Sequence, residues 1–152
     1  MAKIVILGGL LLGLLGLAVL GQAVGGAEEK SVPESGFGVS VSTDRISYAA
    51  GEPITLKLRV FNRTKEAIGF HFRDAQRFDF ILKDEKGDEV WRWSGGMMFA
   101  QMLGKEELGP GQEELVYSAT CEEKLSPGTY ALTGVLVAQD NPMSGSISIS
   151  VK

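Results

Sequence analysis

Alternation of apolar and polar residues is the feature of this sequence that most restricts its fold. Between residues 54 and 60 the even positions hold Ile, Leu, Leu and Val, whereas the odd positions hold Thr, Lys and Arg. Successive side chains of a β-strand point to opposite faces, so this period of two predicts a strand with one buried face. Strand-like segments recur along the chain, at residues 37–42, 54–60, 67–72, 78–82, 90–93, 115–121, 130–136 and 146–151.

The segments between these predicted strands are short and rich in turn-forming residues. Residues 84–88, with the sequence Asp-Glu-Lys-Gly-Asp, predict a hairpin turn. Helical spacing is confined to residues 97–103, where apolar side chains recur four positions apart and predict one or two helical turns. We therefore expect an all-β domain over residues 37–152, an immunoglobulin-like antiparallel β-sandwich of about eight strands.

The N-terminal 27 residues differ in composition from the rest of the chain. Lys3 is followed by an uncharged, apolar run over residues 4–27 that ends in small residues. This pattern predicts either a secretory signal peptide or an uncleaved helix that anchors the chain in a membrane through residues 4–27. Residues 28–36 combine charged residues with proline and glycine, which is typical of a linker. Both alternatives predict an exported protein, secreted or held on the outer side of the cytoplasmic membrane.

Charge and composition argue against several classes of function. The formal net charge of −4 disfavours nucleic acid as a partner, because binding to phosphates requires a basic surface. His71 is the only histidine and Cys121 the only cysteine, so the usual ligand clusters for zinc or copper cannot be assembled. We expect Cys121 to be a small buried side chain and His71 to make one hydrogen bond from a strand face. The sequence predicts no cofactor, no metal and no catalytic residues, hence no enzyme.

The tripeptide Asn62-Arg63-Thr64 has two interpretations. It matches the acceptor sequence for N-glycosylation, and it also lies where a predicted strand must turn. Asparagine favours turns because its side chain bonds to nearby backbone groups, so we favour the turn.

Residues 90–103, with the sequence VWRWSGGMMFAQML, hold more apolar side chains than a loop requires. Trp91 and Trp93 have the same parity, so both rings lie on one face of a strand. In one interpretation both rings face the core, and the apolar side chains that follow cap an open end of the sandwich. In the other, Met97, Met98 and Phe99 bind a partner, with one large apolar side chain entering a pocket. We favour the cap over the contact with a partner, and the sequence keeps both interpretations open.

Several motifs follow one another in an order that resembles a known family. These motifs are VFNRTKEAIGFHF, RFDFILKDEKGDEVWRWS, MMFAQML, LGPGQ and PGTYALTG. Together they resemble the intracellular proteinase inhibitor family, or BsuPI domain, over about residues 38–138. The resemblance implies an immunoglobulin-like sandwich and inhibition of a subtilisin-type serine protease. The chain departs from it in the export pattern and at residues 120–124, where the family leads us to expect a tryptophan and a longer hairpin.

Two functions follow as hypotheses. The first is an exported, non-catalytic inhibitor of a subtilisin-like serine protease. The second is an exported immunoglobulin-like module that binds another protein of the cell envelope and has no inhibitory activity.

Overall fold

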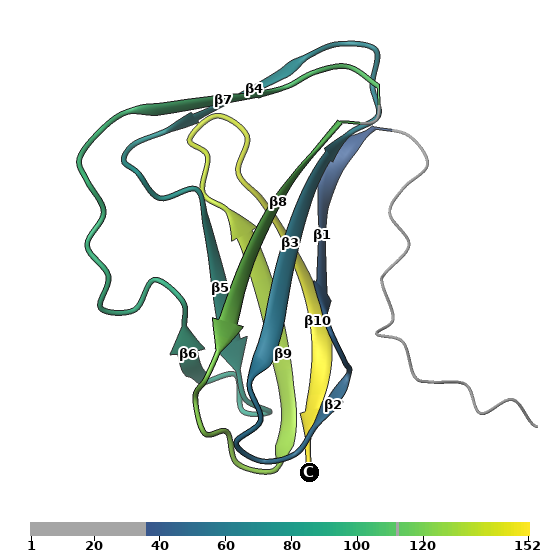
Figure 1. Cartoon of the computed structure of the whole chain (residues 1–152), viewed down its shortest axis with the longest axis vertical. Coiled ribbons are helices and arrows are strands. Elements are labelled where there is room, and N and C mark those ends of the chain that lie inside the picture. Colours follow the sequence, from purple (N-terminus) through teal and green to yellow (C-terminus); the bar gives the residue numbers. More distant parts are fainter. Residues whose placement is uncertain (1–35, 112) are drawn as a thin grey trace, which may run out of the picture.

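Figure 1 shows the computed structural model of the chain, which describes residues 36–111 and 113–152. Every regular secondary-structure element in this part of the chain is a strand, which confirms the predicted all-β fold. The ten strands are β1 (Phe37–Thr43), β2 (Ser47–Tyr48), β3 (Ile54–Asn62), β4 (Ile68–Phe72), β5 (Phe78–Lys83), β6 (Glu89–Arg92), β7 (Gly104–Leu108), β8 (Glu113–Cys121), β9 (Gly128–Leu136) and β10 (Met143–Val151).

Two sheets face each other and form the sandwich. One sheet has the strand order β1-β3-β8, and the other has the order β2-β10-β9-β5-β6. A separate pair, β4 and β7, crosses one end of the molecule, at the top of Figure 1. The predicted immunoglobulin-like antiparallel sandwich is confirmed, with one departure: β2 runs parallel to β10, with Ser47 opposite Ser150.

Two of the ten strands are absent from the prediction of about eight, and both lack its signal. β2 has only two residues, too few to show an alternation. β7 has the sequence GKEEL, in which only Leu108 is buried. Its polar composition therefore carries no period of two, and its strand conformation is fixed by pairing with β4.

The main core lies between the two sheets. On β3 the side chains of Leu56 and Leu58 are completely buried, whereas Thr55 and Lys57, which alternate with them, are exposed. Phe80 of β5 and Leu132 of β9 face them from the other sheet and are equally buried. Burying a side chain of this size contributes about 1.5–3 kcal/mol, so the alternation in the sequence is the main source of stability.

The second core cluster lies at the end of the sandwich that β4 and β7 cross. Phe70 and Phe72 of β4 and Leu108 of β7 are buried there with Val60 and Leu136 of the main strands. The β4–β7 pair therefore closes this end of the molecule.

The close approach of the two sheets is visible at Gly134 of β9. A Cβ atom at this position would lie 2.8 Å from Val41 Cγ2 and 3.1 Å from Leu58 Cδ1. Real Cβ atoms do not approach neighbours so closely, so glycine is required where β1 and β3 press against β9.

The two predicted turns are confirmed. At residues 84–88 the Asp84 N–H donates to the Asp88 carbonyl at 2.9 Å, and Gly87 has a φ of 86°, a conformation that favours glycine. Asn62 is completely buried. Its amide Nδ2 donates to the carbonyls of Glu66 at 2.7 Å and Gly109 at 2.8 Å, and its Oδ1 accepts from Thr64 N at 3.0 Å. A side chain used in this way is not available for glycosylation.

The predicted export segment, residues 1–27, and nearly all of the predicted linker lie outside the described residues. Within residues 36–111 and 113–152 there is no helix of the length and apolarity needed to cross a membrane.

Candidate functional site

The segment from Ser94 to Leu103, here called the apolar loop, connects β6 of the five-stranded sheet to β7. In Figure 1 it runs along one side of the sandwich, from β6 near the bottom to β7 at the top. It contains no helix, so the predicted helical turns are wrong. Apolar pairs four residues apart stabilise a helix by only about 0.2–0.5 kcal/mol each, which does not offset the nucleation of so short a helix.

A buried carboxylate holds the start of the apolar loop. Asp79 of β5 is only 4% exposed, and its Oδ1 accepts from the Ser94 backbone N–H at 3.1 Å. Its Oδ2 accepts from the Ser94 hydroxyl at 2.6 Å and from Arg92 Nη1 at 3.0 Å. Hydrogen bonds to an ionised group are about twice as strong as neutral ones. The chain therefore leaves β6 in one fixed direction.

Stacked aromatic rings support the next part of the loop. Trp93 stacks on Phe78 with ring centroids 4.2 Å apart, and Phe78 stacks on Tyr117 at 5.0 Å. Phe99 is half-buried, and its ring lies 6.0 Å from that of Trp93. The prediction that Trp91 and Trp93 face the core is confirmed, since both are partly buried against the main cluster. Phe99 thus ties the middle of the loop to the domain.

The far end of the loop is held by the chain between β4 and β5. Ala75 N–H donates to the Ala100 carbonyl at 2.9 Å. Arg77 lies against Gly104 so closely that any Cβ there would collide with its guanidinium group. The same guanidinium donates to Glu106 Oε1 at 2.8 Å and lies 4.5 Å from the centre of the Phe72 ring.

Glu106 also connects this end of the loop to the three-stranded sheet. The Tyr117 hydroxyl donates to Glu106 Oε2 at 2.7 Å. Burial, and then the neighbouring carboxylate, raise the pKa of Tyr117 far above its usual value, so the hydroxyl remains a donor at all physiological pH values.

Four large apolar side chains of the loop point away from the domain. The exposed fractions are 47% for Met97, 98% for Met98, 64% for Met102 and 82% for Leu103. The interpretation of this segment as a cap is therefore wrong for Met98, Met102 and Leu103, because β4 and β7 already close the nearby end. Only Phe99 packs inward as that interpretation requires.

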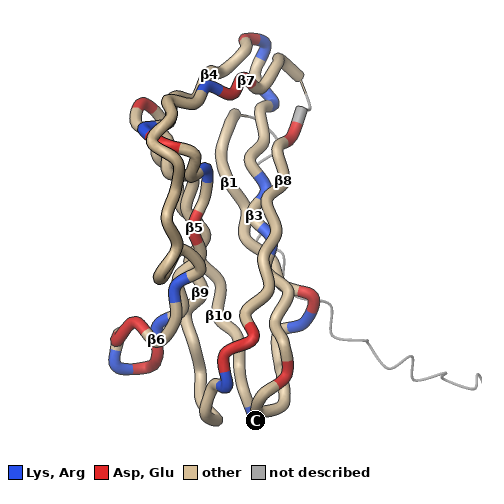
Figure 2. The backbone as a smooth tube through the Cα atoms, turned by 60° about the vertical axis from the view of Figure 1, so that its left-hand side comes forward, with Lys and Arg blue, Asp and Glu red and all other residues tan. Residues whose placement is uncertain are grey.

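The apolar loop also carries no charge. No Asp, Glu, Lys or Arg occurs between Arg92 and Lys105, and Figure 2 shows the corresponding stretch in tan between the charges of β6 and β7. The loop is therefore an exposed, uncharged, apolar strip about ten residues long, held by hydrogen bonds at both ends. Surfaces of this kind on soluble proteins commonly mark contacts with other proteins.

The structure brings together residues that the sequence did not connect. Of the three candidate contact residues, Met97 and Met98 are exposed and Phe99 is half-buried behind them. Asp79 and Ser94 were present in the motifs that resemble a family, yet nothing in the sequence indicated that one holds the other. Arg77 begins one of these motifs, whereas Glu106 lies outside them, and nothing in the sequence indicated that the two pair at the far end of the loop.

His71 lies in β4 and pairs with Asp140 on the surface. Its Nδ1 is 2.6 Å from Asp140 Oδ2, as expected for a histidine with one hydrogen bond on a strand face. No third titratable group completes a catalytic arrangement in these contacts, and the described residues contain no group of three potential metal ligands. The pair is best understood as a surface contact.

The His71–Asp140 pair predicts a weak dependence of stability on acid pH. The hydrogen bond from His71 lowers the pKa of Asp140 from 3.8 to about 2. Because the folded state has the lower pKa, the stabilisation is present above pH 3.8 and is lost as the pH falls towards 2. The Tm of Asp140→Asn should be lower than that of the unsubstituted chain at pH 5, and the difference should shrink towards pH 2. A difference that stays constant over this range would contradict the pairing.

Cys121 ends β8 and is completely buried, as expected from the sequence. Burial raises the pKa of its thiol, which reduces the reactive thiolate form. We expect a thiol reagent to react with the folded chain at least about 100-fold more slowly than with the chain in urea, because reaction requires opening of the strand. The reagent releases a coloured thiolate of its own when it reacts with Cys121, and the absorbance of that product measures both rates. Equal rates for the folded and the unfolded chain would contradict this burial.

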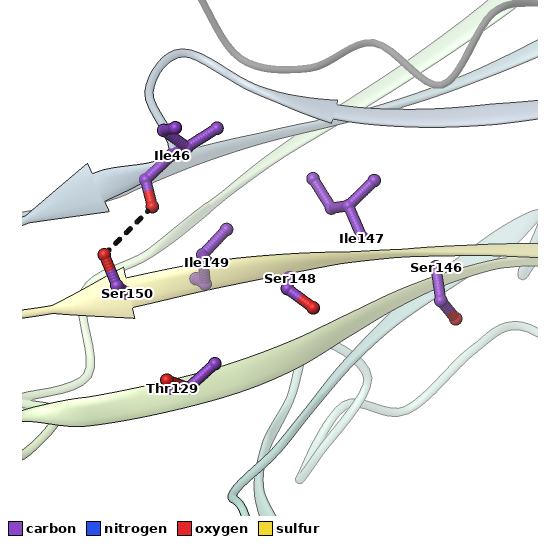
Figure 3. Close-up of a pocket in the computed structure, with 7 residues that line it drawn as sticks. All are labelled: Ile46, Thr129, Ser146, Ile147, Ser148, Ile149 and Ser150. Carbon is purple, nitrogen blue, oxygen red and sulfur yellow. Dashed lines mark hydrogen bonds between the residues drawn. The ribbon is translucent and has the colours of Figure 1, made fainter. Parts of the chain in front are cut away.

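A hollow of about 470 Å³ lies away from the loop, where β10 passes Ile46 (Figure 3). The Ser150 hydroxyl donates to the Ile46 carbonyl at 3.4 Å across its end. The lining residues are Ile46, Thr129, Ser146, Ile147, Ser148, Ile149 and Ser150. None has a titratable side chain at neutral pH, so the lining supplies no general base for catalysis.

Comparison with solved structures finds similar chains, and two of them are described here. Spo0M, a sporulation control protein from Bacillus subtilis, superposes with a TM-score of 0.48 and 18% identity over 78% of this chain and 50% of its own. The chain thus spans half the length of Spo0M. The CARDB domain of a Pyrococcus furiosus protein gives a TM-score of 0.46 and 13% identity over 82% of this chain and 97% of its own. No curated protein matches the sequence.

A family model does match, over residues 41–141, and it is described as intracellular proteinase inhibitor, BsuPI. This description contradicts the predicted export, secretion and placement at the cell envelope, which rested on the apolar composition of residues 4–27. Composition records how apolar a segment is, and not the compartment in which the protein works. The match supports an inhibitor-like, non-catalytic function with a proteinase as partner. Because it covers more than half of the chain and agrees with the motifs read from the sequence, the protein belongs to the BsuPI family of intracellular proteinase inhibitors.

Proposed function

We propose that this protein inhibits a subtilisin-type serine protease and that the apolar loop enters the active-site cleft of the enzyme. The observation that carries the proposal is the 98% exposure of Met98, at the centre of a loop held at both ends. A large apolar side chain in water gains free energy when it enters an apolar pocket. Met98 is the side chain of the loop best placed to do so, and Met97 lies beside it.

The support on each side of Met98 fits an inhibitor better than a substrate. Proteases that bind an extended peptide as an added strand must order that peptide, which costs free energy for a flexible substrate. Here Asp79 fixes Ser94 at the start of the loop, and Trp93 and Ala75 hold Phe99 and Ala100 after Met98. The loop is therefore ordered before binding. After a cut near Met98, both new ends would remain attached to the domain, which favours a slowly dissociating complex.

A titration tests the proposal. The full chain is added in increasing amounts to a subtilisin-type protease that cleaves a small chromogenic peptide. We expect the activity to fall linearly and to reach zero near one inhibitor per enzyme. Full activity in the presence of a large excess of the chain would overturn the proposal.

Substitution of Met98 tests whether the loop makes the contact. Burying a methionine side chain contributes about 1.5–3 kcal/mol, so Met98→Ala should weaken inhibition by about 10- to 100-fold. Val116→Ala is the matched control, because Val116 is also an exposed apolar residue but lies on β8, away from the loop. Equal inhibition by both variants would exclude the apolar loop as the contact.

A further inference from the structure

We propose that oxidation of the methionines of the apolar loop, above all Met98, to the sulfoxide by a peroxide switches off the inhibition of the protease. This inference rests on the proposed function and concerns the regulation of the same site. It starts from the positions of the methionines. Three of the five methionines of the chain lie in this loop, within a stretch of six residues.

The three loop methionines are open to a small oxidant in solution. Met98 is 98% exposed, and Met97 and Met102 are about half and two thirds exposed, respectively. The remaining methionine of the described residues, Met143 in β10, is partly buried against the second core cluster. Because oxidation of a thioether requires contact between its sulfur and the oxidant, exposure directs the reaction to the loop.

The competing target of a peroxide is shielded. Cys121 is completely buried at the end of β8, and burial raises the pKa of its thiol. The thiolate is the nucleophile that attacks a peroxide, so a buried thiol that keeps its proton reacts slowly. The folded chain therefore combines an accessible set of thioethers with an inaccessible thiol.

The chemical step needs only the oxidant. A lone pair of the Met98 sulfur attacks one oxygen of hydrogen peroxide, an S–O bond forms, the O–O bond breaks, and the proton of the transferred oxygen passes to the departing hydroxide. Sulfur is oxidised by two electrons, and the peroxide is reduced to one molecule of water. The product is a polar, chiral sulfoxide on a side chain that was apolar.

The sulfoxide changes what the loop offers to an apolar pocket. Its oxygen is a strong hydrogen-bond acceptor, and burial of a polar group without a partner is unfavourable. We expect the oxidised chain to inhibit at least about 10-fold more weakly than the reduced chain. The domain itself should keep its stability, because the oxidised side chains point into solvent.

The test compares the full chain before and after treatment with hydrogen peroxide. The peroxide is removed before the protease is added, so that the enzyme is not exposed to it. Peptide mass spectrometry locates each added oxygen, and urea unfolding checks that the domain is intact. Loss of inhibition with the sulfoxide at position 98, and recovery after treatment with methionine sulfoxide reductases, is the expected result.

Two variants identify the residue responsible. Met98→Leu removes the sulfur from the proposed contact and keeps an apolar side chain of similar size, so the inhibition that it shows before peroxide treatment should be the same afterwards. Met143→Leu is the matched control and should remain sensitive to peroxide. The inference is overturned when the chain oxidised at position 98 inhibits as well as the untreated chain, or when Met98→Leu loses inhibition to the same extent. An untreated chain that does not inhibit would instead overturn the proposed function, and the switch with it.

Discussion

Substitution of Asn62 by alanine is expected to lower the free energy of unfolding by about 3–5 kcal/mol, because it removes a buried network of hydrogen bonds at once. Asn62 Nδ2 donates to the carbonyls of Glu66, Leu108 and Gly109, and Oδ1 accepts from the backbone N–H and the hydroxyl of Thr64. These bonds join the end of β3 to the end of β7. Without the amide, the buried Leu108 carbonyl and the partly buried carbonyls of Glu66 and Gly109 lose their donor.

Equilibrium unfolding in urea, followed by the fluorescence of the tryptophans, measures this loss. Thr64→Ser is the matched control, since it keeps the hydroxyl that donates to Asn62 Oδ1 at 2.7 Å. It should change the free energy of unfolding by less than about 1 kcal/mol. A similarly small change for Asn62→Ala would show that the network contributes little. A domain of this size has only about 5–15 kcal/mol of stability in total, so the expected loss is a large part of it.

The framework of strands could be predicted from the sequence because its signal is local. In β3 the apolar or polar character of each residue from Ile54 to Val60 predicts which face of the strand it lies on, and the observed burial follows that alternation. β7 shows the limit of this reasoning. Its residues Lys105, Glu106 and Glu107 carry no apolar alternation, and it becomes a strand because β4 lies beside it.

The role of the apolar loop could not be predicted in the same way. Whether Met98 and Leu103 cap the sandwich or point into solvent depends on what else covers that end, and β4 and β7 do so. β4 and β7 pair with each other although they are far apart in the sequence, so a local pattern does not reveal that they cover this end. Helical spacing of the apolar residues was a misleading local signal, because the loop has no surface of its own on which to bury a helix face.

The buried carboxylate was equally hidden from sequence analysis. Asp79 lies between Phe78 and Phe80 in a strand, where a polar residue normally marks the solvent face. It is buried because Ser94, fifteen positions away, and Arg92 supply donors to it. The motifs that resemble the BsuPI family include both Asp79 and Ser94. The motifs do not show that Ser94 donates hydrogen bonds to Asp79.

This relationship leads to the second large effect, expected for Asp79→Ala. The substitution removes the acceptor of the Ser94 hydroxyl, the Ser94 N–H and the Arg92 guanidinium. Breaking a buried charged pair costs about 3–5 kcal/mol, and Arg92 is partly exposed and keeps Glu89, so we expect about 3 kcal/mol in urea unfolding. Glu89→Gln is the matched control. It weakens only the exposed Glu89–Arg92 pair, and its unfolding curve should lie close to that of the unsubstituted chain.

Inhibition should respond to Asp79→Ala more strongly than stability alone predicts. At a temperature where the variant is still folded, the start of the apolar loop is no longer fixed at Ser94, and the protease must order it on binding. The titration should then show weaker inhibition by the folded variant, although Met98 is unchanged. Asp79→Asn keeps the size of the side chain and one carbonyl oxygen. Its inhibition should therefore be weaker than that of the unsubstituted chain and stronger than that of Asp79→Ala. Inhibition that is undiminished in folded Asp79→Ala would mean that the fixed exit from β6 is not what makes the loop an inhibitor.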